Sequence, residues 1–173
     1  RDPARMADML GAIADQTIGY LRGQIEAGAE AVQLFDSWAG SLAPDEFDRW
    51  VIAPNAAIVG ALKESHPDIP IIGFPRGAGS LYLPYVQETA VDGIGVDPSV
   101  TTKWAARVLQ PHCVVQGNLD PVRLLCGGDN LVLVVEKIIA DLKDGPFIFN
   151  LGHGVIKETD PENIDFLKSL LYP

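Results

Sequence analysis

The sequence predicts an α/β fold built on a parallel β-sheet. Short apolar runs of strand-like composition recur along the 173 residues, and segments with apolar residues at helical spacing separate them. Glycine and proline mark many of the junctions. Strand and helix alternate five times in this way, which is typical of βαβ units, in which each crossover helix returns the chain to a parallel strand.

The first three expected elements are a helix, a strand and a second helix. Apolar residues recur at helical spacing over residues 4–26, and a buried strand over residues 30–35 follows. Proline is favoured in the first turn of a helix, so Pro44 predicts the start of a helix over residues 44–62. Pro54 predicts a bend in this helix, because proline removes a backbone hydrogen bond.

The middle of the chain alternates in the same way. Residues 69–74 form a continuous apolar run, which predicts a strand buried on both faces. The loop that follows, over residues 75–80, carries Arg76, the only arginine expected at the carboxyl end of a strand. A helix over residues 81–90, a strand over 93–96 and a helix over 101–109 come next.

The last expected elements are two strands and two helices. A strand over residues 114–117 ends in turn-forming residues that include Asn118, Asp120 and Pro121, whose side chains are expected to hold neighbouring loops. An amphipathic helix over residues 129–143 comes next, followed by the last strand over 147–149 and a helix from Pro161 towards Leu171. Phe147 and Phe149, in this last strand, are expected in the core.

Five βα units leave two architectures open. A closed (β/α) barrel needs eight strands, so the chain is either an open doubly wound sheet or the later part of a barrel. Doubly wound folds commonly bind nucleotides through a glycine-rich loop. Gly77-Ala78-Gly79 follows a strand but matches neither the dinucleotide nor the P-loop pattern, which disfavours a nucleotide site.

Composition and charge narrow the possible partners. The formal net charge of −10 makes nucleic acid and anionic membranes poor partners for the surface as a whole. No apolar run is long enough to span a bilayer, and residue 1 does not open a signal peptide, so we expect a cytoplasmic protein without membrane contact. Two cysteines, Cys113 and Cys126, give no disulfide framework, and His112-Cys113 lacks a second pair of ligands for zinc.

Polar residues follow two of the expected strands at the point where each ends. Asp36 and Ser37 follow the strand that carries Phe35, and His153 lies between glycines after the last strand. Because parallel strands place their carboxyl ends at one edge of a sheet, Ser37 and His153 are expected to converge on one anionic guest. The residues alone leave two other roles open: Ser37 could cap the next helix, and His153 could bond a loop carbonyl.

Three segments with their order and spacing resemble the C-terminal half of the uroporphyrinogen decarboxylase family. They are Leu-Phe-Asp-Ser-Trp-Ala-Gly at residues 34–40, Gln-Gly-Asn-Leu-Asp-Pro at 116–121 and Asn-Leu-Gly-His-Gly at 150–154. Asp160-Pro161-Glu162 follows the histidine as in that family. The resemblance covers essentially the whole chain.

The resemblance implies a fold and an activity. The fold is a single (β/α)8 TIM-barrel domain, of which residues 1–173 are the C-terminal part with about the last five βα units, the N-terminal half being absent. The activity is decarboxylation of the four acetate side chains of uroporphyrinogen III to coproporphyrinogen III in haem and tetrapyrrole biosynthesis. The family works without metal or organic cofactor, and typically as a homodimer.

The resemblance also implies roles for three residues. Ser37 matches a serine that contacts the substrate, Phe35 an aromatic residue lining the same cleft, and His153 a catalytic histidine at a substrate carboxylate. Arg76 matches no family residue. A substrate contact is open, but its place in a loop favours a solvated charge. The family's proton donor and central aspartate lie in its N-terminal half, so residues 1–173 would orient the substrate and be inactive alone.

Two other functions remain as alternatives. One is a cobalamin-dependent methyltransferase of the same superfamily, with zinc held by His and Cys. The other is a non-catalytic tetrapyrrole-binding fragment. Part of a barrel also leaves edge strands uncovered, which predicts poor solubility or pairing with another chain.

Overall fold

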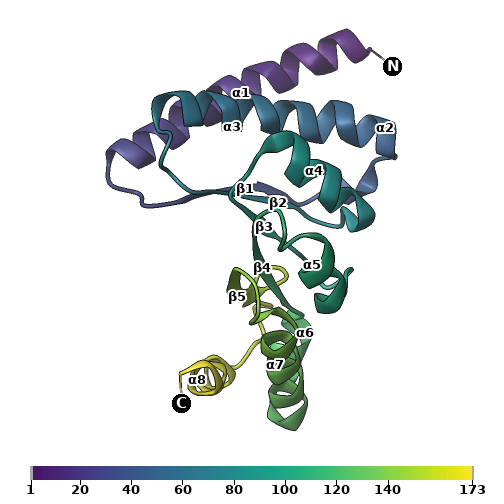
Figure 1. Ribbon diagram of the computed structural model, residues 1–173, viewed down its shortest axis with the longest axis vertical. Helices are drawn as coiled ribbons and strands as arrows, with labels where there is room; N and C mark the ends of the chain where they lie inside the picture. The colour runs from purple at the N-terminus through teal and green to yellow at the C-terminus, as the bar shows by residue number, and fades with distance from the viewer. Residues whose placement is uncertain (1, 173) are drawn as a thin grey trace. The chain divides into compact units, whose positions relative to one another are not determined.

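Strand and helix alternate throughout the chain, as the sequence predicted. The computed structural model describes residues 2–172, and Figure 1 shows its ribbon. The strands are β1 (Val32–Asp36), β2 (Ile71–Pro75), β3 (Gly93–Gly95), β4 (Val114–Leu119) and β5 (Phe147–Leu151). The α-helices are α1 (Pro3–Glu26), α2 (Pro44–Phe47), α3 (Ala53–Ser65), α4 (Tyr82–Thr89), α5 (Thr102–Val108), α6 (Pro121–Cys126), α7 (Gly128–Leu142) and α8 (Pro161–Leu171).

The strands follow one another in sequence order, β1-β2-β3-β4-β5, and β1 with β2, β2 with β3, and β4 with β5 pair in parallel. The chain forms two compact units, of which the first ends at Ile94 and the second begins at Gly95. In each unit, parallel pairing brings the carboxyl ends of neighbouring strands to the same edge.

In the first unit, α1 lies along α3 (Figure 1). Arg22 on α1 joins the two helices, because its guanidinium donates to the carbonyl oxygen of Ala61 at 3.0 Å and to the Ser65 hydroxyl at 3.2 Å. β1 is buried on one face only: Val32 and Leu34 are buried, whereas Phe35 is exposed. The sequence predicted a buried strand here, and the structure buries only one of its two faces.

The helix predicted over residues 44–62 is present and is interrupted where the sequence indicated a bend. A π-helical turn, η2 (Asp48–Ile52), joins α2 to α3. Pro54 occupies the first turn of α3 and has no N–H to donate to a helical hydrogen bond. At the end of the π-helical turn, the Ala53 N–H donates to the carbonyl oxygen of Asp48, five residues earlier.

The second unit packs one apolar face of α7, from Leu131 and Val135 to Ile138 and Leu142, into its core. Two sequence predictions need correction here. α6 was not expected, because its six residues are too few to show helical periodicity. Phe147 and Phe149 contact each other at a centroid distance of 6.3 Å but are only half-buried, so they are not core residues.

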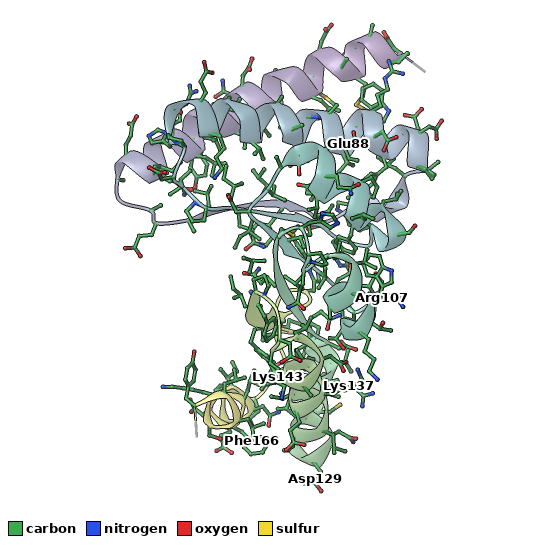
Figure 2. All side chains as sticks on the ribbon, viewed as in Figure 1. Glu88, Arg107, Asp129, Lys137, Lys143 and Phe166 are labelled. Carbon is green, nitrogen blue, oxygen red and sulfur yellow. The ribbon has the colours of Figure 1, made fainter. Side chains whose placement is uncertain are left out.

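A polar cluster joins α5 to α7 within the second unit. The Thr102 hydroxyl donates to the Asp141 carboxylate, and the Lys137 ammonium donates to the Thr102 hydroxyl at 3.1 Å and to the same carboxylate. Lys137 lies on α7 in Figure 2. Among residues 2–172, no helix combines the length and apolar character that crossing a membrane requires.

Candidate functional site

The carboxyl end of β1 carries Phe35, Asp36 and Ser37. The Phe35 side chain is 70 % exposed, and its ring meets the ring of Phe74 on β2 edge-on at a centroid distance of 5.9 Å. Ser37 is also exposed and, within residues 2–172, caps neither of the helical turns that follow: the first has Trp38 and the next Ala43 at its cap position, without a side-chain bond. The capping role left open for Ser37 is therefore not observed.

Asp36 fixes the loop that carries Ser37. Its carboxylate accepts a hydrogen bond from the Trp38 N–H at 3.2 Å, and its carbonyl oxygen accepts one from the Arg76 N–H at 3.0 Å. Asp36 therefore has a structural role in this loop. The loop is thus tied both to itself and to the end of β2.

The loops after β1 and β2 also meet backbone to backbone. The Gly40 N–H donates to the carbonyl oxygen of Arg76 at 3.0 Å. A Cβ atom on Gly40 would lie 2.3 Å from the carbonyl oxygen of Gly77, so no other residue fits without displacing a loop. Gly77 itself has a φ of +77°, which favours glycine. These contacts fix the backbone on both sides of Ser37 and Arg76.

Tyr85 on α4 packs beneath the same strands. A Cβ on Gly73 of β2 would lie 2.7 Å from the Tyr85 hydroxyl oxygen, so this close approach requires glycine. Burial raises the pKa of the Tyr85 phenol well above its usual range, and the nearby Asp36 carboxylate raises it further. Tyr85 is therefore a neutral packing residue at physiological pH.

A cavity of about 290 Å³ opens between α1, β1 and α3. Phe35 and Asp36 line it together with apolar residues such as Leu10, Ile13 and Ile58, whereas Ser37 is not among the lining residues. No lysine or arginine lines it within residues 2–172. An apolar wall without cations does not suit a polycarboxylate, so this cavity is not the anion site that Ser37 was predicted to serve.

Asn118 organises the corresponding edge of the second unit. Its side chain is buried in β4, and its amide donates to the carbonyl oxygens of Asp97 at 3.0 Å and Val100 at 2.9 Å. The peptide bond that joins Gly117 to Asn118 is cis. The sequence indicated a turn at Asn118, but β4 continues to Leu119, and the amide secures the loop after β3 from within the sheet.

His153 follows a tightly packed glycine. The Gly152 N–H donates to the carbonyl oxygen of Leu119 at 2.7 Å, and a Cβ on Gly152 would lie 2.5 Å from Cδ of Pro98. His153 itself is exposed, and within residues 2–172 its imidazole has no hydrogen-bond partner. The loop-carbonyl role left open for this histidine is therefore not observed.

The cysteines do not form a metal site with their neighbours. Cys113 is buried, and burial raises the pKa of its thiol to about 12, which disfavours the thiolate that binds metals. Cys126 is exposed. In the part of the chain that the structure describes, no three His, Cys, Asp or Glu side chains gather where they could hold a metal ion.

The predicted site residues are thus distributed over both units. Phe35 and Ser37 lie together at the end of β1, and His153 lies after β5 in the second unit. That Ser37 and His153 surround one guest stays a prediction. The sequence predicted that the Asn118 side chain holds a neighbouring loop, which its bonds to Asp97 and Val100 confirm, but it placed Asn118 in a turn and not inside β4.

The family model and the most similar curated proteins indicate the same family for this chain. The family model described as uroporphyrinogen decarboxylase (URO-D) matches residues 1–171. Proteins named uroporphyrinogen decarboxylase from Erythrobacter litoralis and Sphingopyxis alaskensis are 54 % and 52 % identical over 166 residues, or 96 % of this chain. These alignments cover 49 % and 48 % of the two relatives, so the chain spans about half the length of the curated relatives it matches.

A solved structure shares the fold. A methyltransferase from Methanosarcina mazei superimposes with a TM-score of 0.73, covering 91 % of this chain and 46 % of its own, at 17 % sequence identity. At that identity the likeness concerns the fold alone. The parallel strands, the alternating helices and these matches identify the architecture as part of a (β/α)8 barrel. The chain belongs to the uroporphyrinogen decarboxylase family.

Proposed function

We propose that this chain is the C-terminal part of a uroporphyrinogen decarboxylase. The enzyme removes carbon dioxide from the four acetate side chains of uroporphyrinogen III and yields coproporphyrinogen III, without metal or organic cofactor. It acts in the cytoplasm as a homodimer. The observation that carries the proposal is the family match over residues 1–171, together with relatives of that name at about half identity.

The chemistry explains why no cofactor is needed. Loss of carbon dioxide from an acetate leaves an electron pair that requires an acceptor. Protonation of the pyrrole carbon beside the side chain turns the ring into that acceptor, and a second proton converts the resulting methylene into a methyl group. Loss of the first proton from the ring carbon then restores the aromatic pyrrole. Each acetate therefore consumes one net proton and releases one carbon dioxide. A general acid and a carboxylate near the pyrrole N–H groups promote these steps, and both belong to the N-terminal half.

Residues 1–173 supply groups that orient the substrate. Ser37 and His153 are exposed at strand ends and have no hydrogen-bond partner within residues 2–172, so both can donate to carboxylate arms. Phe35 presents an exposed ring beside Ser37 that can line the same cleft. The tight packing of Gly40 and Gly152 limits movement of the loops that carry Ser37 and His153, as orientation requires.

A chimera tests this proposal. We join residues 1–173 to the N-terminal half of the Erythrobacter litoralis relative and measure coproporphyrinogen formation from uroporphyrinogen III. The chimera is expected to turn over, and S37A and H153A are each expected to lower kcat/KM by about tenfold or more, because each removes a charge-assisted hydrogen bond. Q16A, on the exposed part of α1, is the matched control. A folded chimera that binds uroporphyrin but forms no product would favour the non-catalytic alternative.

A further inference from the structure

We propose that Arg76 is a substrate-binding residue whose guanidinium holds a carboxylate arm of the anionic guest. This inference rests on the proposed function and adds a residue that the resemblance did not supply. Two observations carry it. Arg76 is fixed beside Ser37, and its guanidinium has no partner within residues 2–172, whereas the other half-buried cations of the same unit are bonded.

Arg76 lies at the carboxyl end of β2, beside the loop after β1 at which the anionic substrate is proposed to bind. It comes directly after β2, and both of its backbone polar groups bond to the Ser37 loop: the N–H to the carbonyl oxygen of Asp36 and the carbonyl oxygen to the Gly40 N–H, each at 3.0 Å. The backbone of Arg76 is therefore fixed beside Ser37. A fixed backbone lowers the conformational entropy that the loop has to lose when it binds a ligand.

The other half-buried cations of the first unit are bonded. Lys63 donates to the carbonyl oxygen of Ile69 at 2.8 Å and pairs with the Asp92 carboxylate at 2.8 Å, and Arg22 bonds to Ala61 and Ser65. Arg76 is half-buried as well, yet within residues 2–172 its guanidinium has neither a hydrogen bond nor an ion pair. The Arg76 guanidinium therefore has no counter-charge in the described part of the chain, and an anionic guest can supply one.

The chemistry of the guanidinium fits a carboxylate guest. Its planar N–H groups can donate two parallel hydrogen bonds to one carboxylate, which fixes the direction of the arm as well as its charge. Ser37, on the adjoining loop, can donate a third. On a chain with a net charge of −10, such a local cation also counteracts repulsion of a polycarboxylate.

The test uses the chimera described above with R76Q and R76K. R107Q is the control, because it removes the same charge from an exposed position on α5 that Figure 2 shows. We expect R76Q to raise KM for uroporphyrinogen III about tenfold to hundredfold while kcat stays within about twofold, and R76K to recover part of the loss. The Kd for uroporphyrin, an oxidised analogue that retains the carboxylates, is expected to rise by the same factor.

Three outcomes would overturn the inference. An unchanged KM with a lowered melting temperature would show that Arg76 pairs with a carboxylate of the protein. An unchanged Kd for uroporphyrin, or a fall in kcat alone, would show that it does not bind the substrate. If the unsubstituted chimera forms no product, the proposed function fails, but the comparison of uroporphyrin Kd between R76Q and the parent still decides the role of Arg76.

Discussion

At the scale of single residues, a contact between two glycines determines the geometry of the loop that carries Ser37. Gly40 has no room for a side chain, because the Gly77 carbonyl oxygen occupies the position that a Cβ would approach. The contact joins loops that follow different strands, so no local sequence pattern predicts it. It links the positions of Ser37 and Arg76 through the backbone alone.

Replacement of Gly40 by alanine is expected to destabilise the protein. The new methyl group would lie 2.3 Å from the Gly77 carbonyl oxygen and force the loops apart, which costs about 1–3 kcal/mol by analogy with overpacked cores. Urea unfolding of the chimera measures the free energy of unfolding. G60A is the control, since Gly60 lies within α3 with no atom within 4 Å of its Cβ position. That change should be neutral or slightly stabilising, and equal effects of both substitutions would contradict the packing explanation.

Sequence reasoning located the residues at strand ends better than it assigned their environments. Phe35, Ser37 and His153 were placed correctly, because an apolar run that breaks at polar or glycine residues marks the end of a strand. The half-burial of Phe147 could not be predicted, because the sequence of an apolar strand does not reveal whether other elements cover the face on which a phenylalanine lies. The bonds of Asn118 to Asp97 and Val100 depend on a loop distant in sequence.

At the scale of elements, the helices were predictable wherever a proline or a long apolar period marks them. Pro44 and Pro161 open α2 and α8 as expected, and Pro54 marks the change from the π-helical turn to α3. The π-helical turn itself has no sequence signature beyond that proline. α6 was missed for a related reason, since one and a half turns contain too few residues to show a period.

The joint between α5 and α7 is expected to make stability depend on pH. Hydrogen bonds from Lys137 and Thr102 lower the pKa of Asp141 below its ordinary value near 3.8. A group whose pKa is lower in the folded state stabilises it above the unfolded pKa and loses that contribution as pH falls through the folded pKa. The Asp141 contribution should therefore be complete at neutral pH and disappear below about pH 4.

D141N tests this joint. We expect it to lower the free energy of unfolding at pH 7 by about 0.5–2 kcal/mol and to leave it nearly unchanged at the lowest pH at which the chimera still folds. Denaturant unfolding at several pH values measures the difference. D129N, which alters an exposed carboxylate in the first turn of the same helix, is the control. A loss for D141N that is the same at every pH would contradict the ionic explanation.

At the scale of the whole molecule, the barrel family could be recognised from three short segments, because strand-end loops carry the residues that a family's chemistry requires. The number of strands was also predictable from their alternation with helices. The alternation of strands and helices along the sequence does not reveal which surfaces remain uncovered. β1 and β5 are the outer strands of the order, and α1 exposes Met9 and Ile13 at 51 % and 53 %.

Residues 1–173 expressed alone are expected to self-associate. The unpaired edge of β1 and the exposed apolar side chains of α1 offer sites for another chain. Light scattering should give a mass above the 18.6 kDa of the single chain. M9E with I13E should reduce that mass, whereas A7E, at an exposed position of the same helix, should not. A uniform monomer of the unaltered chain would contradict this expectation.

The close packing of Gly40 and Gly152 has a consequence for redesign. Each of these positions excludes even a methyl group, since a neighbouring loop fills the space. Attempts to adapt the strand ends to bulkier or differently charged molecules should therefore exchange outward-facing side chains and leave both glycines intact. In a library that randomises whole loops, most variants would carry a side chain at one of these glycines and could not adopt the loop conformation.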